Sequence, residues 1–142
     1  TPTDVDAIAR MKRLLWPDAH EDLAQDSLNI IENGEPDLLL VADDGESLRG
    51  FIEVSERRYA EGCRSSPVPY IEGWWVDPEH REQGCGAALV LAAEEWARGL
   101  GLTEMASDAD LANELSHDAH RALGYAEAGR MICFLKSIEG AV

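Results

Sequence analysis

A glycine-rich stretch in the middle of the chain has the composition of an anion-binding loop. It reads Arg81-Glu82-Gln83-Gly84-Cys85-Gly86-Ala87-Ala88-Leu89 and lies between a predicted strand and a predicted long helix. Gly84 and Gly86 let the backbone turn tightly and approach a ligand closely. The N–H groups of the first helical turn would then face an anion such as a pyrophosphate, and Arg81 could add a charge-assisted contact.

Three kinds of ligand are bound by glycine-rich loops at the start of a helix, and their sequence patterns differ. A nucleoside triphosphate loop has the pattern G-x-x-x-x-G-K-[ST], which this stretch lacks. A dinucleotide fingerprint has a third glycine where this chain has Leu89, and it opens the first βαβ unit rather than lying in mid-chain. Coenzyme A is the third ligand, and a glycine-rich helix start without any ligand is the remaining alternative.

Two carboxylates lie where a charge needs a cationic partner, for example the ammonium form of an amine. Glu72 lies in an otherwise apolar strand-like stretch, and Asp108 directly follows another. An amine is mostly protonated at neutral pH and becomes a nucleophile only after it loses a proton. A carboxylate binds the ammonium form and can accept that proton directly or through a water molecule. The alternatives are an outward-facing strand residue for Glu72, and a turn residue or helix cap for Asp108.

The elements that would position these residues follow from hydrophobic periodicity and turn signals. A first helix has Ile8, Met11 and Leu14 on one face and ends at Trp16-Pro17, because the residue before proline avoids helical geometry. The other predicted helices span 20–32, 84–98 and 113–123. The predicted strands span 38–42, 48–56, 69–76, 103–107 and, as one strand or a pair, 125–135. This order predicts a single α/β domain with a mixed sheet over residues 1–142.

The charge balance limits the classes of partner. The chain has 142 residues, with 12 Lys and Arg against 28 Asp and Glu, for a formal net charge of −16. Binding to nucleic acid requires a basic surface, so this balance argues against a nucleic-acid partner. An acidic field favours the capture of cationic ligands, although acidity also serves solubility alone.

The cysteines and the apolar runs bear on the cellular compartment. Cys63, Cys85 and Cys133 are odd in number, widely spaced and without a C-x-x-C pair. This pattern argues against a disulfide framework or a zinc site and predicts free thiols in a reducing compartment. The sequence has no signal-peptide pattern and no run of about 18 apolar residues, so we expect a cytoplasmic protein that does not bind a membrane or a metal.

The glycine-rich loop resembles the pyrophosphate loop of the GNAT superfamily of acetyltransferases. That loop has the pattern R/Q-x-x-G-x-G/A, which Arg81, Gly84 and Gly86 match, and residues 70–78 match the strand that usually precedes it. The resemblance implies a GNAT fold, in which about four helices flank a mixed, mostly antiparallel sheet with splayed central strands. It also implies acetyl-CoA as co-substrate.

A second GNAT pattern, N-x-x-A-x-x-x-Y-x-x-x-G-F/Y, resembles residues 113–125. Asn113, Gly124 and Tyr125 match it, whereas His120 stands where the pattern has its tyrosine. In many family members that tyrosine protonates the departing thiolate of coenzyme A. A histidine titrates near neutral pH and could do the same, with simple packing on the cofactor as the alternative.

A narrower resemblance, to bacterial aminoglycoside 6′-N-acetyltransferases, covers nearly the whole chain. It rests on Trp16-Pro17, on 59–68, on 70–73 and on 104–108. It implies that Glu72 and Asp108 face the acetyl group and act on the amine, and that Trp16 and Tyr59 line the substrate pocket together with them. The cofactor-binding residues that the resemblance implies are Trp74, Trp75, Val76, Arg81, Glu82, Gln83, Gly84, Cys85, Gly86, Ala87 and Asn113.

These features predict transfer of acetyl from acetyl-CoA to the 6′-amine of an aminoglycoside antibiotic, which would confer resistance. The transfer would be direct within a ternary complex, because Cys85 lies in the phosphate loop, too far along the chain from the acetyl position to be an obvious nucleophile. The alternatives are acetylation of another small polyamine or amino sugar, and a non-catalytic acyl-CoA sensor. Edge strands of small α/β domains often pair between copies, which makes a homodimer plausible.

Overall fold

The computed structural model describes residues 4–17, 28, 31–32, 38–43, 45–81 and 84–140. It divides into two compact units, Thr1–Asp108 and Ala109–Val142. None of the helices in these described ranges is long and apolar enough to cross a membrane.

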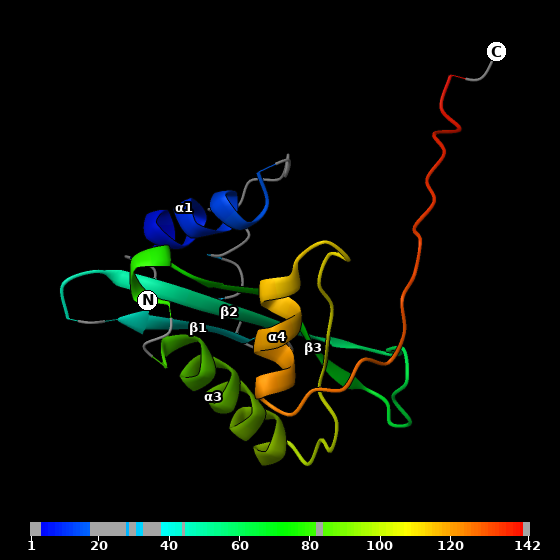
Figure 1. The fold of residues 1–142 in the computed structure, drawn as a ribbon. Helices are drawn as coiled ribbons and strands as arrows, with labels where there is room; N and C mark the ends of the chain where they lie inside the picture. Colours follow the sequence, from blue (N-terminus) through cyan, green and yellow to red (C-terminus); the bar gives the residue numbers. More distant parts are fainter. Residues whose placement is uncertain are drawn as a thin grey trace. The chain divides into compact units, whose positions relative to one another are not determined.

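A four-stranded mixed sheet forms the centre of the first unit (Figure 1). Its strands are β1 (Leu38–Asp43), β2 (Leu48–Arg57), β3 (Val68–Val76) and β4 (Ala106–Ser107). β1, β2 and β3 pair antiparallel in that order, and β4 pairs parallel to β3. The mixed, mostly antiparallel sheet of the sequence prediction is therefore confirmed.

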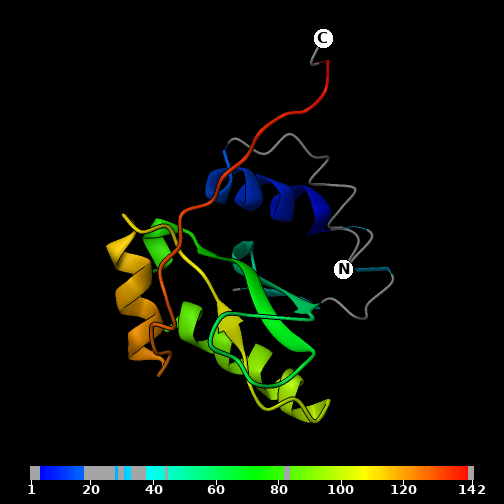
Figure 2. The same cartoon turned by 90° about the vertical axis from the view of Figure 1, so that its right-hand side faces the viewer.

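Helices α1 (Val5–Leu15) and α3 (Cys85–Gly99) cover opposite faces of this sheet (Figure 2). On the α1 face, Ile8 and Met11 pack with Phe51 of β2 in a buried cluster. α1 ends one residue before Trp16, as the Trp16-Pro17 pair predicts. Of the predicted helix 20–32, only residues 28, 31 and 32 are described, and they are helical.

β3 carries one extra residue relative to β2, and that residue is Glu72. Gly73 pairs with Glu53 and Ile71 pairs with Val54, so Glu72 forms a β-bulge between them. Alternation already puts Tyr70 and Glu72 on one face, and the bulge brings Gly73 to the same face.

The pairing of β3 with β4 is short. It joins Tyr70 to Ala106 and Ile71 to Ser107. Glu72 and Asp108 are the next residues along the two strands, so both lie where the pairing ends. This is the splayed geometry that the family resemblance implies.

The second unit contains helix α4 (Glu114–Ala122), which confirms the helix predicted at 113–123. The predicted strand at 125–135 is wrong, because residues 125–138 have no regular secondary structure. A strand needs a partner for its backbone N–H and C=O groups, and α4 is the only regular element among the described residues of this unit. Apolar composition alone therefore gave a false strand signal.

A buried ion pair connects α1 to the sheet. Lys12 is fully buried, and its Nζ lies 3.1 Å from Oε2 of Glu53 on β2. Removing one partner of a buried pair leaves an uncompensated charge, which costs far more than replacing both partners with apolar groups.

We therefore expect Lys12→Met to lower the free energy of unfolding by about 3–5 kcal/mol. The double variant Lys12→Met/Glu53→Leu should recover most of that loss, because it removes both charges. Arg13→Met, at the exposed neighbouring position, is the control and should change stability by less than about 0.5 kcal/mol. Urea unfolding followed by circular dichroism measures all three. A Lys12→Met protein as stable as the control would contradict this role for the pair.

Candidate active site

Glu72 is held by donors from the neighbouring strand. Arg57 donates from Nε to Oε1 at 2.7 Å and from Nη2 to Oε2 at 2.6 Å. Ser55, two residues earlier on β2 and on the same face, donates its hydroxyl to Oε1. Both oxygens of the Glu72 carboxylate are therefore engaged, with the guanidinium bound in the bidentate fork that arginine favours.

Tyr70 connects this pair to Asp108. The Tyr70 hydroxyl donates to Oδ2 of Asp108 at 2.6 Å. The guanidinium carbon of Arg57 lies 3.6 Å from the centre of the Tyr70 ring, in cation–π contact. The two carboxylates that the sequence singles out are thus linked by one continuous set of contacts through Arg57 and Tyr70.

These contacts define the protonation states around Glu72. Partial burial would raise the pKa of Glu72, but the hydrogen bonds from Arg57 and Ser55 outweigh it and hold that pKa below its ordinary value. Burial, followed by the hydrogen bond to Asp108, raises the pKa of Tyr70. The hydrogen bond to Glu72 raises the pKa of Arg57. At neutral pH the cluster therefore contains an ionised Glu72, a cationic Arg57 and a phenol that acts as donor.

The two carboxylates differ in their capacity to accept a proton. Donors occupy both oxygens of Glu72, whereas the bond from Tyr70 engages one oxygen of Asp108. Hydrogen bonds to the ionised form disfavour protonation. The three donors on Glu72 therefore favour its ionised form, and the role of Asp108 as proton acceptor stays a prediction.

Trp16 lies beside this cluster. A Cβ atom built on Gly73 would come within 2.5 Å of the Trp16 ring, so the absence of a side chain at Gly73 is what allows the ring to lie against β3. The ring also packs edge-on against Phe51, with 6.3 Å between centroids. The structure thus brings one predicted substrate residue next to the strand position that follows Glu72.

Tyr59, the other aromatic residue predicted for the substrate pocket, lies two residues beyond Arg57 and is 67% exposed. Its hydroxyl donates to Glu61 at 2.9 Å, and this hydrogen bond raises the pKa of Tyr59. Glu104 ties the same loop to the segment before β4, since it accepts hydrogen bonds from Arg64 N at 2.9 Å and Ser65 N at 2.7 Å.

The glycine-rich loop has the backbone geometry of an anion site. Gly84 adopts φ of +81°, in the left-handed region that favours glycine, and α3 begins at the next residue. Ala88 N donates the first helical hydrogen bond, to Gly84 O at 2.9 Å. The N–H groups of Cys85, Gly86 and Ala87 come before it and lack helical acceptors, which suits a pyrophosphate. Glu82 and Gln83 lie outside the described residues.

The end of β3 is fastened to this loop. Trp74 donates from Nε1 to Gly86 O at 3.2 Å. Arg81 donates from Nε to Val76 O at 2.8 Å, and its guanidinium lies 4.6 Å from the centre of a Trp75 ring. Arg81 therefore braces the end of β3 in this structure, and its contact with a pyrophosphate stays a prediction.

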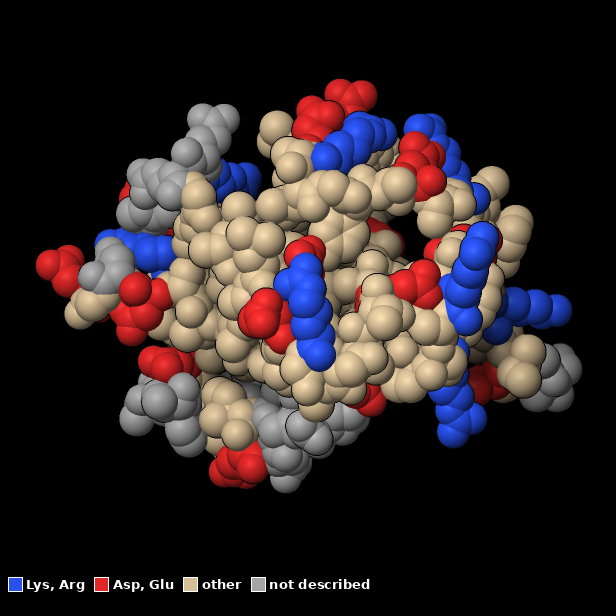
Figure 3. Space-filling view, turned by 90° about the horizontal axis from the view of Figure 1, so that it is seen from below, with Lys and Arg blue, Asp and Glu red and all other residues tan. Residues whose placement is uncertain are grey.

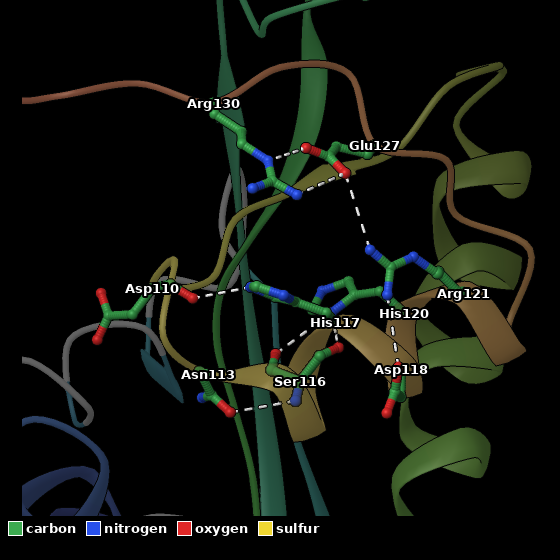
Figure 4. Close-up of polar contacts among 9 residues, drawn as sticks. All are labelled: Asp110, Asn113, Ser116, His117, Asp118, His120, Arg121, Glu127 and Arg130. Carbon is green, nitrogen blue, oxygen red and sulfur yellow. Dashed lines mark hydrogen bonds and ion pairs between the residues drawn. The ribbon is translucent and has the colours of Figure 1, made fainter.

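In the second unit, Asn113 and His120 both contact the backbone of α4 (Figure 4). Asn113 caps the helix, because its Oδ1 accepts a hydrogen bond from Ser116 N at 3.1 Å. His120 Nδ1 lies 2.7 Å from Ser116 O and 3.3 Å from Ser116 Oγ, so this ring nitrogen faces the preceding turn of α4.

A surface hollow of about 310 Å³ also lies in the second unit. Its lining includes Arg121 and Arg130, both of which form ion pairs with Glu127 (Figure 4). None of the predicted substrate residues lines it.

Four residues of the candidate site were not predicted from the sequence: Ser55, Arg57, Tyr70 and Glu104. Ser55 lies directly opposite Tyr70, and Arg57 lies opposite Val68. The only available signal was the alternation of polar residues near the end of a predicted strand, and that signal does not identify the opposing residues without the register. The net charge gave no signal for Arg57 either, because it does not distinguish one arginine from another. Figure 3 shows that basic side chains are interspersed with acidic ones on the face that it draws.

The sequence model of the acetyltransferase (GNAT) family matches residues 6–125. The chain belongs to this family. The chain is 44% identical over 141 residues to an aminoglycoside N(6′)-acetyltransferase type 1 of Klebsiella aerogenes, and the alignment covers 96% of this chain and 92% of the relative. It is 39% identical over 140 residues to the enzyme of the same name from Stenotrophomonas maltophilia, and that alignment covers 98% of this chain and 91% of the relative.

Solved structures agree with this assignment. AAC(6′)-Iy in complex with the bisubstrate analogue CoA-S-monomethyl-acetylneamine superposes with a TM-score of 0.87 at 32% identity, covering 95% of this chain and 92% of that one. The 6′-N-acetyltransferase AAC(6′)-Ih of Acinetobacter baumannii gives 0.84 at 36% identity, covering 97% and 95%. The GNAT fold inferred from the loop motif is thereby confirmed.

The fit of the loop to coenzyme A can be tested at Gly86. A Cβ atom there would lie 3.3 Å from the Trp74 ring, so the branched side chain of Gly86→Val should push Trp74 aside and displace the start of α3. We expect the Kd for acetyl-CoA to rise at least about tenfold, equivalent to about 1.4 kcal/mol, with little change in amine affinity. Calorimetry on the folded variant measures both.

Gly99→Ala is the matched control for Gly86→Val. It changes a glycine at the far end of the same helix, where a Cβ atom would meet no atom within 4 Å. Its acetyl-CoA affinity should equal that of the wild type. Unchanged acetyl-CoA affinity in folded Gly86→Val would contradict the assignment of the loop.

Proposed function

We propose that this protein transfers the acetyl group of acetyl-CoA to the 6′-amine of an aminoglycoside, and so confers resistance. The observation that carries the proposal is the placement of Glu72 and Asp108 at the point where β3 and β4 stop pairing. An acyl-CoA sensor has no need of a proton acceptor beside a cation-binding carboxylate. The names of the relatives support the substrate class.

The contacts suggest a division of labour between the carboxylates. Glu72, ionised at neutral pH, holds the 6′-ammonium, and Asp108 accepts a proton from it directly or through a water molecule. The neutral amine nitrogen then attacks the thioester carbonyl, the C–S bond breaks, and coenzyme A leaves as the thiolate. The nitrogen releases its second proton to water as the amide forms. Burial raises the pKa of Cys85, which keeps it a thiol and favours direct transfer over an acyl-enzyme.

The residues that we propose to bind acetyl-CoA lie at the end of β3, in the glycine-rich loop and at the start of α4. Backbone groups of Trp74, Trp75 and Val76 hold the acetyl carbonyl and the pantetheine arm. The pyrophosphate is held by the loop residues Arg81, Glu82, Gln83, Gly84, Cys85, Gly86 and Ala87. Asn113 adds a further contact to the cofactor, and His120 acts as the acid that protonates the thiolate.

The whole chain forms one GNAT domain in this proposal. The family match at 6–125 crosses the boundary between the two compact units, which supports a single evolutionary and functional unit. We also propose that the protein acts in the cytoplasm, a reducing compartment in which the thiols of Cys63, Cys85 and Cys133 stay free.

The assignment of the base is tested by steady-state kinetics of Asp108→Asn. This change keeps the size of the side chain but removes the proton acceptor, so kcat should fall by about 10² to 10⁴ while acetyl-CoA binding stays unchanged. Glu72→Gln should raise the amine KM at least as much as it lowers kcat. A thiol-release assay with kanamycin measures both, and kanamycin lacking the 6′-amine should give no turnover.

Asp110→Asn is the matched control, because it removes an exposed carboxylate two residues away. It should retain wild-type kinetics. Near-native kcat and an unchanged pH profile in Asp108→Asn would remove Asp108 from the role of base. Turnover of spermidine instead of kanamycin would redirect the substrate class to polyamines.

The C-terminal segment supports a homodimer. Phe134 and Leu135 are 91% and 99% exposed, and Met131, Ile132 and Ile138 are exposed as well. A run of strand-forming apolar residues is costly to leave in water, and a second copy of the chain is the partner that is always present.

Phe134→Glu should therefore convert a dimer into a monomer of 15.6 kDa. The charged side chain would have to be buried at the interface, which is strongly unfavourable. Size-exclusion chromatography with light scattering gives the mass. Ser137→Glu, an exposed polar position in the same segment, is the control and should remain dimeric. A monomeric wild-type protein would overturn the proposal.

A further inference from the structure

Arg57 occupies the position on Glu72 that a substrate ammonium would need. Its guanidinium is a cation that donates to both carboxylate oxygens, at 2.7 Å and 2.6 Å. An ammonium group is likewise a cation with several N–H donors. Because the guanidinium already engages both oxygens, an ammonium that binds this carboxylate in the same way must compete with Arg57.

The Arg57–Glu72 pair is accessible enough to exchange partners. The side chains of Arg57 and Glu72 are 43% and 27% exposed. Arg57 is also the last residue of β2, so its side chain can move without opening the core. The guanidinium of Arg57 also lies against the Tyr70 ring, and this cation–π contact can remain when Arg57 loses its hydrogen bonds to Glu72.

We propose that Arg57 is an internal counter-ion of Glu72 that the substrate ammonium displaces, and that this competition limits the affinity for amines. The inference rests on the proposed function, in which Glu72 holds the ammonium. In the free protein Arg57 compensates the carboxylate and keeps it in place. In the complex the substrate supplies that positive charge.

A positioning role for Arg57 has the opposite consequence. If Arg57 stays on Glu72 throughout the reaction, its removal leaves the carboxylate less well held, and amine binding weakens together with turnover. If Arg57 is displaced, its removal eliminates a competitor, and amine binding becomes tighter. The sign of the change in Kd therefore separates the two roles.

The experiment compares Arg57→Gln with Arg58→Gln by calorimetric titration with kanamycin and with spermidine, in the absence of acetyl-CoA. We expect Arg57→Gln to lower the amine Kd about two- to fivefold, the range expected for a competing, partly exposed ion pair. Arg58 is the adjacent exposed arginine, and its replacement changes the net charge equally. Arg58→Gln should leave Kd within about twofold of the wild type, because long-range charge effects are screened by salt.

Nitrogen-15 NMR of the wild-type protein gives an independent readout. The Arg57 Nε–H signal, assigned by its loss in Arg57→Gln, should shift when amine saturates the site. An unmoved signal, weaker amine binding in Arg57→Gln, or an equal gain in Arg58→Gln would each overturn the inference. Thiol release by the wild type tests the proposed function separately, so displacement without acetyl transfer would leave the Arg57 inference standing alone.

Discussion

The β-bulge at Glu72 is the constraint on which the candidate site depends. In a regular strand, Glu72 and Gly73 would point to opposite faces. The bulge puts them on the same face, so the carboxylate meets Ser55 and Arg57 of β2 while the Trp16 ring lies against Gly73. One extra residue in β3 thus brings together the cation-binding carboxylate and an aromatic wall beside it.

β3 contacts both the carboxylate cluster and the glycine-rich loop. Beyond the bulge, Trp74 reaches Gly86 at the start of α3, on the face opposite to Glu72 and Tyr70. One strand therefore positions the carboxylate cluster with the side chains of one face and contacts the glycine-rich loop with Trp74 on the other. The short pairing with β4 leaves Asp108 at the edge of this strand, where Tyr70 holds it.

Two ion pairs of this acidic chain lie along one face of β2. Glu53 pairs with the buried Lys12, and two positions further along the same face Ser55 and then Arg57 reach Glu72. The first pair joins α1 to the sheet, and its cation Lys12 is fully buried, where an unpaired charge is costly. The second is partly exposed to water, where an ion pair is weaker and can exchange partners. The same type of contact is therefore structural at one end of the strand and available for function at the other.

Local sequence was sufficient for helices α1, α3 and α4 and for strands β1, β2 and β3, whereas most of the predicted helix 20–32 lies outside the described residues. Proline and glycine signals set where α1 ends and where α3 begins, because they act on backbone geometry within a few residues. Glu72 and Asp108 could be named for the same kind of reason, as carboxylates in or after apolar strands. Only the tertiary structure decided that Glu72 is a bulge residue and that Arg57 and Tyr70 surround it, because these contacts depend on strand register. The predicted strand at 125–135 failed for a related reason: a strand exists only when a partner satisfies its backbone, and sequence composition does not supply that partner.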